Sequence, residues 1–318
     1  MKKSILFTAL VALLVATSCA GSTEQVANQN KKAPERQNWD DEIPLYGDVE
    51  SVTITEYKLA EKFGEIVKDK IAFKKAYKFN QKGDVAEMAH YYSDGSLSGK
   101  DTYKYDSQGN MIEEAGYNSY GSLNWKSLYK YDSQGNQIEK AHYTSDGSLK
   151  YKELYNYDSQ GNKIEEAGYN SYGSLNWKYL YKHDSQGNLI EMAQYNFDGS
   201  LIWKFTWKYD SQGNKIELAC YNSDGSLYDK WLYKYDSQGN QIEAISYTSD
   251  GSLNRKWLFK YDSQGNKIEY ACYTSDGSLD WKEIYKYDSQ GNQIEKVEYK
   301  GEIMNPRAME VREIVYRK

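Results

Sequence analysis

Alternating apolar and polar positions run through most of the chain, and the alternation recurs with a fixed period. One unit, Tyr105–Lys130, reads YDSQGNMIEEAGYNSYGSLNWKSLYK. It contains two strand-like stretches of about nine residues, each bounded by a turn signal with glycine. The pentapeptide DSQGN recurs in register every 26 residues, and a related NQKGD begins at Asn80; the copies begin at Asp106, Asp132, Asp158, Asp184, Asp210, Asp236, Asp262 and Asp288. A fixed period of this length is typical of a repeat array, here of nine two-strand units.

Both turn signals in a unit favour a tight hairpin. In DSQGN, Asp106 can cap a type I turn with its carboxylate, and Gly109 suits the left-handed position that follows. The second signal, NSDGS or TSDGS, has the same logic. If both are three-residue loops, facing residues keep the same parity around the unit. One face then carries Glu113, Ala115, Tyr117, Leu123, Trp125, Tyr129 and Tyr131, and the other carries Ile112, Glu114, Lys126, Leu128 and Lys130. We expect the first face to be the concave, packed one.

The predicted fold is all-β, a long antiparallel meander of about twenty strands built from hairpin repeats, in a twisted or coiled sheet. We divide the chain into a lipoprotein signal peptide (1–18), a polar tether (19–45), N-terminal capping strands (46–79), nine repeats (80–299) and a C-terminal capping strand (300–318). The pattern leaves open whether the sheet closes into a shell or remains a ribbon. Because repeat stability adds along an array, truncation is expected to shorten the fold rather than abolish it.

The first residues have the form of an export signal. Lys2 and Lys3 precede the apolar run Ile5–Val15, and small residues then lead to Cys19. The stretch Ala16–Gly21 resembles a bacterial lipobox, although Ala16 stands where Leu is usual. We therefore predict lipidation of Cys19 and attachment to the cell envelope, at the outer membrane of a Gram-negative bacterium. The alternative is an ordinary signal peptide in which Cys19 is incidental.

Composition narrows the classes of partner. The chain has 318 residues, 33 of them Tyr, with a mean hydropathy of −0.88. Much of the buried apolar area must therefore come from Tyr rings, whose hydroxyl can stay in water. Lys and Arg together number 40 against 46 Asp and Glu, and the two signs are interspersed. An interspersed acidic chain lacks the basic patch of a nucleic-acid-binding protein, so no nucleic-acid partner is expected.

The repeated motif YDSQGNxIExAxYxSDGSL resembles the YD-repeat (RHS-type) family over about Lys70–Tyr299. The resemblance implies an exported or surface protein whose hairpins build a spiralling β-sheet, in some members a shell around a toxic cargo. The units here look longer and more uniform than usual, and the chain ends at Lys318 without room for a toxin domain. We carry over the surface location and the hairpin architecture, and not the cargo role.

Candidate chemistry is sparse. His90 and His142 share one column, as do Cys220 and Cys272, and each pair is two units apart, about 19 Å by strand spacing. That is too far for a shared metal or a disulfide, so we expect free thiols and no metal.

The Glu113 column recurs in equivalent settings and lacks the asymmetry of a catalytic carboxylate pair. Its expected role is to pair with cross-strand groups or accept hydrogen bonds from Tyr. The turn Asp and Asn residues do not match a calcium loop. No enzyme activity and no cofactor are expected.

Tryptophan is the one candidate binding signal. One column holds Trp125, Trp177, Trp203 and Trp281, and the column two residues on holds Trp231 and Trp257. Such rings could stack on sugars, or they could fill the concave face as packing residues.

The favoured function is a surface-anchored, non-enzymatic repeat scaffold for protein or glycan interaction, with the membrane as partner through the lipid. The alternative is a carbohydrate-binding module using the Trp and Tyr columns. Specificity is expected in the columns that vary, around Glu114, Gly116, Asn124 and Ser127.

Overall fold

The computed structural model describes residues 44–301 and 305–318, and within them it contains strands and turns but no helix. The strands are β1 (Val49–Lys62), β2 (Glu65–Phe79), β3 (Val85–Tyr91), β4 (Leu97–Tyr105), β5 (Met111–Asn118), β6 (Leu123–Tyr131), β7 (Gln137–Thr144), β8 (Leu149–Tyr157), β9 (Lys163–Asn170), β10 (Leu175–His183), β11 (Leu189–Asn196), β12 (Leu201–Tyr209), β13 (Lys215–Asn222), β14 (Leu227–Tyr235), β15 (Gln241–Thr248), β16 (Leu253–Tyr261), β17 (Lys267–Thr274), β18 (Leu279–Tyr287), β19 (Gln293–Lys300) and β20 (Asn305–Tyr316).

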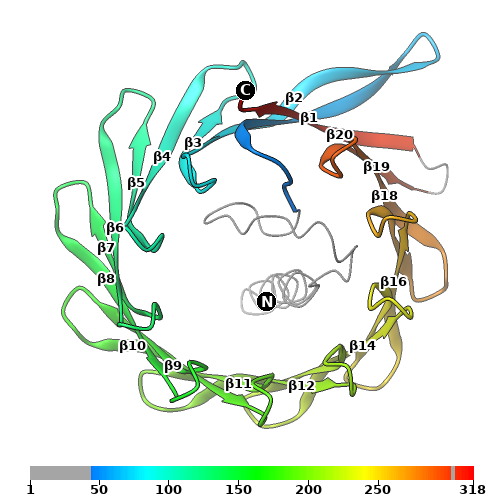
Figure 1. Cartoon of the computed structure of the whole chain (residues 1–318). Coiled ribbons are helices and arrows are strands. Elements are labelled where there is room, and N and C mark those ends of the chain that lie inside the picture. Colours follow the sequence, from blue (N-terminus) through cyan, green and yellow to red (C-terminus); the bar gives the residue numbers. More distant parts are fainter. Residues whose placement is uncertain (1–43, 302–304) are drawn as a thin grey trace.

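The strands form one closed sheet. Each strand pairs antiparallel with the next in chain order, and β1 also pairs antiparallel with β20, so the meander returns to its start (Figure 1). The prediction of an all-β meander of about twenty strands is confirmed, and closure answers the question that the pattern left open. The predicted leader, Cys19 and nearly all of the predicted tether lie in residues 1–43, outside the described part of the chain.

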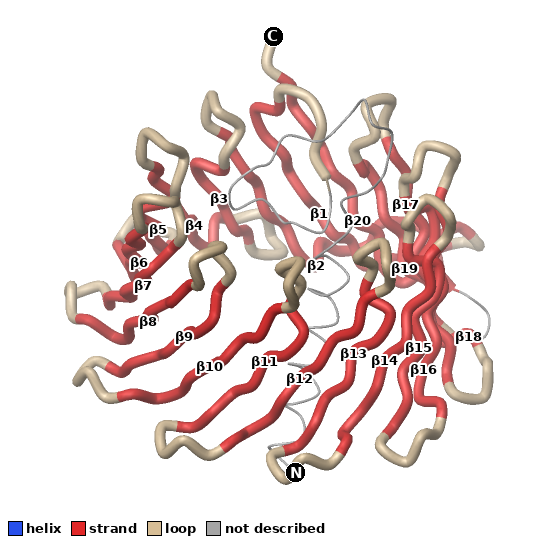
Figure 2. The backbone as a smooth tube through the Cα atoms, turned by 60° about the horizontal axis from the view of Figure 1, so that its bottom comes forward, coloured by secondary structure: helices blue, strands red, loops and turns tan. Residues whose placement is uncertain are grey.

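The turns have the predicted geometry. Asp106 Oδ1 accepts hydrogen bonds from the backbone N–H groups of Gln108 and Asn110, and Gly109 has a φ of +95°. Turns alternate between the two ends of the cylinder, because successive strands are antiparallel (Figure 2). We call the end with the DSQGN-type turns the DSQGN rim. The other end, which carries the turns NSDGS, TSDGS and their variants together with the β1–β2 turn, is the SDGS rim.

The predicted assignment of residues to faces is wrong, because every hairpin contains an extra bulged residue. Tyr117 faces Leu123, but Gly116 faces Trp125, so Asn124 is skipped. At the other end of the unit Tyr131 faces Gln137 while Lys130 faces Glu139. One extra residue in one strand of a pair changes the parity of all later partners. One face therefore carries the columns of Glu113, Ala115, Tyr117, Lys126 and Leu128, and the other those of Glu114, Gly116, Trp125, Ser127 and Tyr129.

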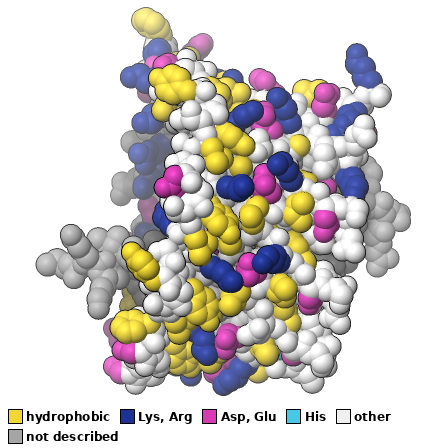
Figure 3. All heavy atoms as spheres, turned by 90° about the vertical axis from the view of Figure 1, so that its left-hand side faces the viewer, with side chains coloured by type: hydrophobic (Ala, Val, Ile, Leu, Met, Phe, Trp, Pro, Cys, Tyr) yellow, Lys and Arg dark blue, Asp and Glu magenta, His cyan; other side chains and the backbone are white. Residues whose placement is uncertain are grey.

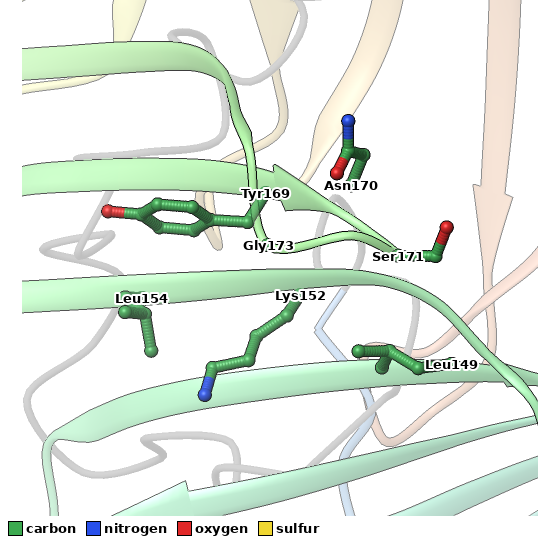
Figure 4. A pocket seen from close by; sticks show the side chains of 7 residues that line it. All are labelled: Leu149, Lys152, Leu154, Tyr169, Asn170, Ser171 and Gly173. Atoms are coloured by element: carbon green, nitrogen blue, oxygen red, sulfur yellow. The ribbon is translucent and has the colours of Figure 1, made fainter.

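The Glu113 face is the outside of the ring. Figure 4 looks at a hollow lined by Lys152, Leu154 and Tyr169 of this face, with the opposite wall of the ring behind them. Figure 3 shows the outer surface, where basic and acidic side chains lie beside one another among apolar ones. Glu139, for example, lies 2.9 Å from both Lys130 and Lys152 on the neighbouring strands. Although partial burial opposes it, hydrogen bonds from the two lysines hold the pKa of Glu139 below its usual value. This is the predicted cross-strand pairing of the Glu column. We call the Glu114 face the inner wall.

A tyrosine at the end of each unit joins neighbouring hairpins. Tyr131 Oη donates a 2.8 Å hydrogen bond to the carbonyl of Met111, which begins the strand after the preceding DSQGN turn. The same bond is made by Tyr105, Tyr157, Tyr209, Tyr235, Tyr261 and Tyr287. In one unit His183 replaces this tyrosine, and its Nδ1 is buried without a hydrogen-bond partner among the described residues.

Restoring the tyrosine should stabilise the ring. We expect His183→Tyr to raise the free energy of unfolding by about 0.5–1.5 kcal/mol, the net value of one intramolecular hydrogen bond. Tyr209→Phe, which removes the same bond one unit further on, should lower it by a similar amount. Chemical denaturation of both variants measures the two changes, and a destabilised His183→Tyr protein would contradict the assigned role.

The ends of the chain close the ring instead of capping a free edge, which corrects the predicted role of the terminal strands. Asn292 accepts a hydrogen bond from the Tyr46 backbone N–H and donates from Nδ2 to the hydroxyl of Tyr316. Tyr316 in turn donates to Asp288 Oδ2 at 2.8 Å. Arg317 donates to the carbonyl oxygens of Phe79 and Asn80, so the last residues hold β20 against the first turn of the array. Val49, Val52 and Ile54 of β1 pack in an apolar cluster beside this seam.

Candidate functional site: the inner wall

The differences between repeat units are concentrated on the inner wall. On the outer face, Glu recurs at the Glu113 position and Tyr at the Tyr117 position in all nine units. On the inner wall, the Gly116 column reads His90, Gly116, His142, Gly168, Gln194, Cys220, Ser246, Cys272 and Glu298. The Ser127 column reads Asp101, Ser127, Glu153, Tyr179, Phe205, Trp231, Trp257 and Glu283. Of the four columns predicted to vary, those of Glu114, Gly116 and Ser127 thus share one wall, and Asn124 is a bulged residue.

All six candidate tryptophans point to the inner wall, but they differ in burial. Trp203 is 2 % exposed and Trp231 is 7 % exposed, so their faces are covered. The other four, Trp125, Trp177, Trp257 and Trp281, are partly exposed. Trp125 lies over Gly116, where an added Cβ would come within 2.3 Å of the indole nitrogen, and Trp177 lies over Gly168 in the same way. Glycine in the facing strand is therefore what lets these two indole rings approach the backbone this closely.

Aromatic contacts link neighbouring strands along the wall. His142 stacks between Trp125 and Tyr151, with ring centroids 5.4 and 4.8 Å away. A second group runs from Tyr179 through Trp203 and Phe205 to Trp207, and Trp231 stacks on Trp257 at 4.6 Å. Offset and edge-to-face contacts at these separations add stability beyond the area that they bury. The inner wall thus carries several separate groups of aromatic side chains in contact.

Carboxylates and tyrosines form pairs on the same wall. Tyr129 Oη donates to Glu114 Oε2 at 2.8 Å, and Tyr181 donates to Glu166 at 2.9 Å. Burial, followed by the neighbouring negative charge of Glu114, raises the pKa of Tyr129 far above its usual value. These hydroxyls therefore stay protonated, and each donates its single proton to the neighbouring carboxylate.

Two charged residues interrupt the Trp125 column, and the sequence reasoning missed them. Asp229 faces the buried Cys220 across the strands, and its Oδ1 has no hydrogen-bond partner among the described residues. Arg255 donates to Asp280 at 2.6 Å and to the Cys272 sulfur at 3.3 Å. Both cysteines are free and buried. The signal that could have found these sites was in the sequence, since Asp and Arg each stand where four other units place Trp.

The buried Asp229 should make stability depend on pH. Burial raises the pKa of Asp229 to about 6, although the Trp231 side chain opposes the shift. Because the folded pKa lies above the unfolded value of about 3.9, the penalty is absent below pH 4 and develops as pH rises to 6. We expect Asp229→Asn to raise the free energy of unfolding by about 1–3 kcal/mol at pH 8 and to leave it unchanged at pH 4. Denaturation at the two pH values measures this, and an equal change at both would exclude it.

No group of three or more His, Cys, Asp or Glu side chains that could hold a metal ion occurs within residues 44–301 and 305–318. His90 Nε2 instead lies 3.0 Å from Asp101 Oδ2 on the adjacent strand. The same described ranges include no helix long and apolar enough to cross a membrane.

Comparisons with known proteins find only weak similarities and do not show a family for the chain. A model of a family described as "Uncharacterised protein" matches residues 208–313, and no curated protein matches the chain. A crystal structure of TcdB2–TccC3 is similar at 15 % identity and a TM-score of 0.32, over 74 % of this chain and 15 % of that one. A porin-like protein from Bacteroides uniformis ATCC 8492 is similar at 9 % identity and a TM-score of 0.36, over 84 % and 98 %. At these scores neither similarity carries an argument about function. The fold itself defines a closed, all-β repeat protein.

Proposed function

We propose that the chain is a non-enzymatic binding scaffold of the cell envelope that takes a protein or glycan ligand against its inner wall. The observation that carries this proposal is that, within the strands, most of the differences between units fall on that wall. A wall that served packing alone could use one residue per column, as the Glu113 and Tyr117 columns of the outer face do. The inner columns instead offer aromatic faces, carboxylates, an arginine and tyrosine hydroxyl oxygens that can accept hydrogen bonds, which together can recognise a mixed polar and apolar ligand.

The outer face supports an aqueous setting for the ring. Lys–Glu pairs recur around it, as between Lys208, Glu217 and Lys230 at 2.8 Å each. A lysine on a lipid-facing strand costs about 2–4 kcal/mol at the middle of a bilayer. We therefore place the ring beside the membrane, held by a lipid on Cys19 through the polar segment that follows. The resemblance of the DSQGN units to YD-repeat proteins supports the same surface role.

A glycan is the second candidate, favoured by the partly exposed tryptophans. Trp125 and Trp177 lie close over glycines and remain partly exposed on the wall. Sugar rings stack on such faces, whereas the buried Trp203 and Trp231 can only support their neighbours. Binding to a glycan array that is lost in Trp125→Ala and Trp177→Ala would select this version of the proposal. If no glycan on the array binds the chain, the glycan version of the proposal is excluded.

The general proposal is tested by capture from envelope extract, read by mass spectrometry and glycan analysis. The mature chain is compared with an inner-wall variant, Trp177→Ser with Arg255→Gln, and with an outer-face variant, Lys126→Gln with Lys152→Gln. We expect a specific ligand to be lost with the first variant and kept with the second. Equal capture by the inner-wall variant, or hydrolysis of an envelope polymer by the purified chain, would overturn the proposal.

A further inference from the structure

The SDGS rim carries a set of exposed aromatic side chains that the binding proposal does not use. Tyr120 and Tyr172 are 92 % and 93 % exposed at the tips of the β5–β6 and β9–β10 turns. Phe197 is exposed at the tip of β11–β12, Tyr92 at β3–β4 and Phe63 at β1–β2. All five lie on one rim, because each turn joins an odd strand to the following even one. The other rim, with its DSQGN turns, has no such residues at its turn positions.

Three of these aromatics replace polar residues of the repeated turn and do nothing for it. In the common form NSDGS, Asp224 Oδ1 accepts hydrogen bonds from the backbone N–H and the hydroxyl of Ser226. In NSYGS that cap is lost, and Asn118 alone accepts from the N–H groups of Tyr120 and Ser122. Phe197 stands where other turns have Ser. Tyr120 and Tyr172 give up the Asp cap, Phe197 leaves the Asp198 cap in place, and none of the three rings gains burial, so their benefit must come from outside the folded chain.

The β1–β2 hairpin adds strain and a facing pair of lysines to the same rim, and Glu61, Glu65 and Asp69 nearly balance its lysines in charge. Its end projects beyond the ring, where residues 59–73 pair only within the hairpin (Figure 1). Phe63 is the one non-glycine residue in the described part of the chain with a left-handed backbone, at φ +56°. A bulky residue there is strained. Lys58 and Lys70 face each other directly, a like-charge pairing that disfavours the hairpin.

We propose that this aromatic arc of the SDGS rim docks on a lipid surface. Hairpin tips follow one another at about 10 Å, two strand spacings, so the rings form separate projections around an arc. Hot spots of protein partners cluster in one packed, desolvated centre, and separated aromatic tips do not form one. A bilayer interface accepts aromatic rings at many points, with Tyr hydroxyls remaining at the headgroup level. Lys58 and Lys70 find anionic headgroups there. The tips without an aromatic ring are acidic: Asp146 lies within the arc, at β7–β8, and Asp224, Asp250 and Asp276 follow it at the next tips.

The test is flotation with vesicles of phosphatidylethanolamine and phosphatidylglycerol. The chain from Ala20 to Lys318, made without lipid, keeps every described residue and isolates the contribution of the rim. We expect the triple variant Tyr120→Ser, Tyr172→Ser and Phe197→Ser to reduce the vesicle-bound fraction at least tenfold. The matched control replaces Ile112, Ile164 and Ile216, which are 37–40 % exposed near the DSQGN rim, by Ser and should bind as the parent does.

Two further measurements complete the test. Lys58→Gln with Lys70→Gln should remove most of the dependence of binding on phosphatidylglycerol while the aromatic contribution remains. Thermal unfolding of the triple variant should match the parent, because its three replaced side chains are mostly exposed, and the isoleucine control is compared at a temperature where it is fully folded. The proposal is overturned if the parent chain does not float with these vesicles, or if the triple variant and its control bind alike. Since the lipid on Cys19 is absent from this chain, the outcome is independent of the anchoring proposal.

Discussion

Deleting residues 305–318, which contain β20, will open the ring, lower the free energy of unfolding by more than about 5 kcal/mol and cause the chain to associate. β20 forms nine residue pairs with β1 and six with β19. Its removal leaves both neighbours with unpaired backbone groups, which readily pair with other chains. The two exposed strands cannot simply join, because two odd-numbered strands of an antiparallel meander run in the same direction.

The matched control for this deletion removes one whole internal unit, Asp158–His183. Tyr157 is then followed by Asp184, so the DSQGN pattern continues without interruption. An even number of strands remains, and β1 can still pair with β20 in the antiparallel sense. We expect this shorter chain to remain a monomer in analytical ultracentrifugation, while the chain without β20 sediments as larger species. Identical behaviour of the two deletions would show that ring closure does not govern the fold.

Replacing Phe205 by Ala should lower the free energy of unfolding by about 3–5 kcal/mol, the usual loss for a fully buried aromatic residue. Phe205 has no exposed surface, and its ring contacts Trp203 at 4.6 Å and Trp207 at 6.0 Å between centroids. The cavity should also admit water to both indoles and shift their fluorescence to longer wavelength.

Phe197→Ala is the control for this substitution. It removes the same side chain four residues before β12 begins, but from an exposed position, and should change stability by less than about 0.5 kcal/mol. Denaturation followed by tryptophan fluorescence compares the two variants directly. Equal losses would mean that the aromatic lining around Phe205 does not pack as a core.

The sequence contained enough to predict the local structure of each unit. Asp106 and Gly109 make the turn that their chemistry favours, and regular turns imply a strand count near twenty. The bulge was not predictable in this way, because a bulged residue such as Asn124 carries no distinctive side chain, and it changed the face of every column beyond it. Closure of the sheet also could not be predicted from the pattern within one unit. It depends on curvature accumulated over the whole sheet, until Val49 meets Tyr316.

The same distinction holds for the candidate site. The columns of Glu114, Gly116 and Ser127 could be recognised as variable by comparing units with one another. Their position together on the inside of a ring, with Trp125, required the actual register. The neutral, buried surroundings of Asp229 depend on residues from three strands, so no single unit reveals them.

Because the repeat array closes into a ring, its internal diameter depends on the number of units. Each added or lost unit changes the circumference by two strand spacings, about 10 Å, and hence the internal diameter by about 3 Å. Because the two bulges of a unit restore each other's parity, a whole duplicated unit keeps its variable columns facing inward. Unequal recombination between identical DSQGN segments can therefore change the internal diameter of such a ring without altering any strand.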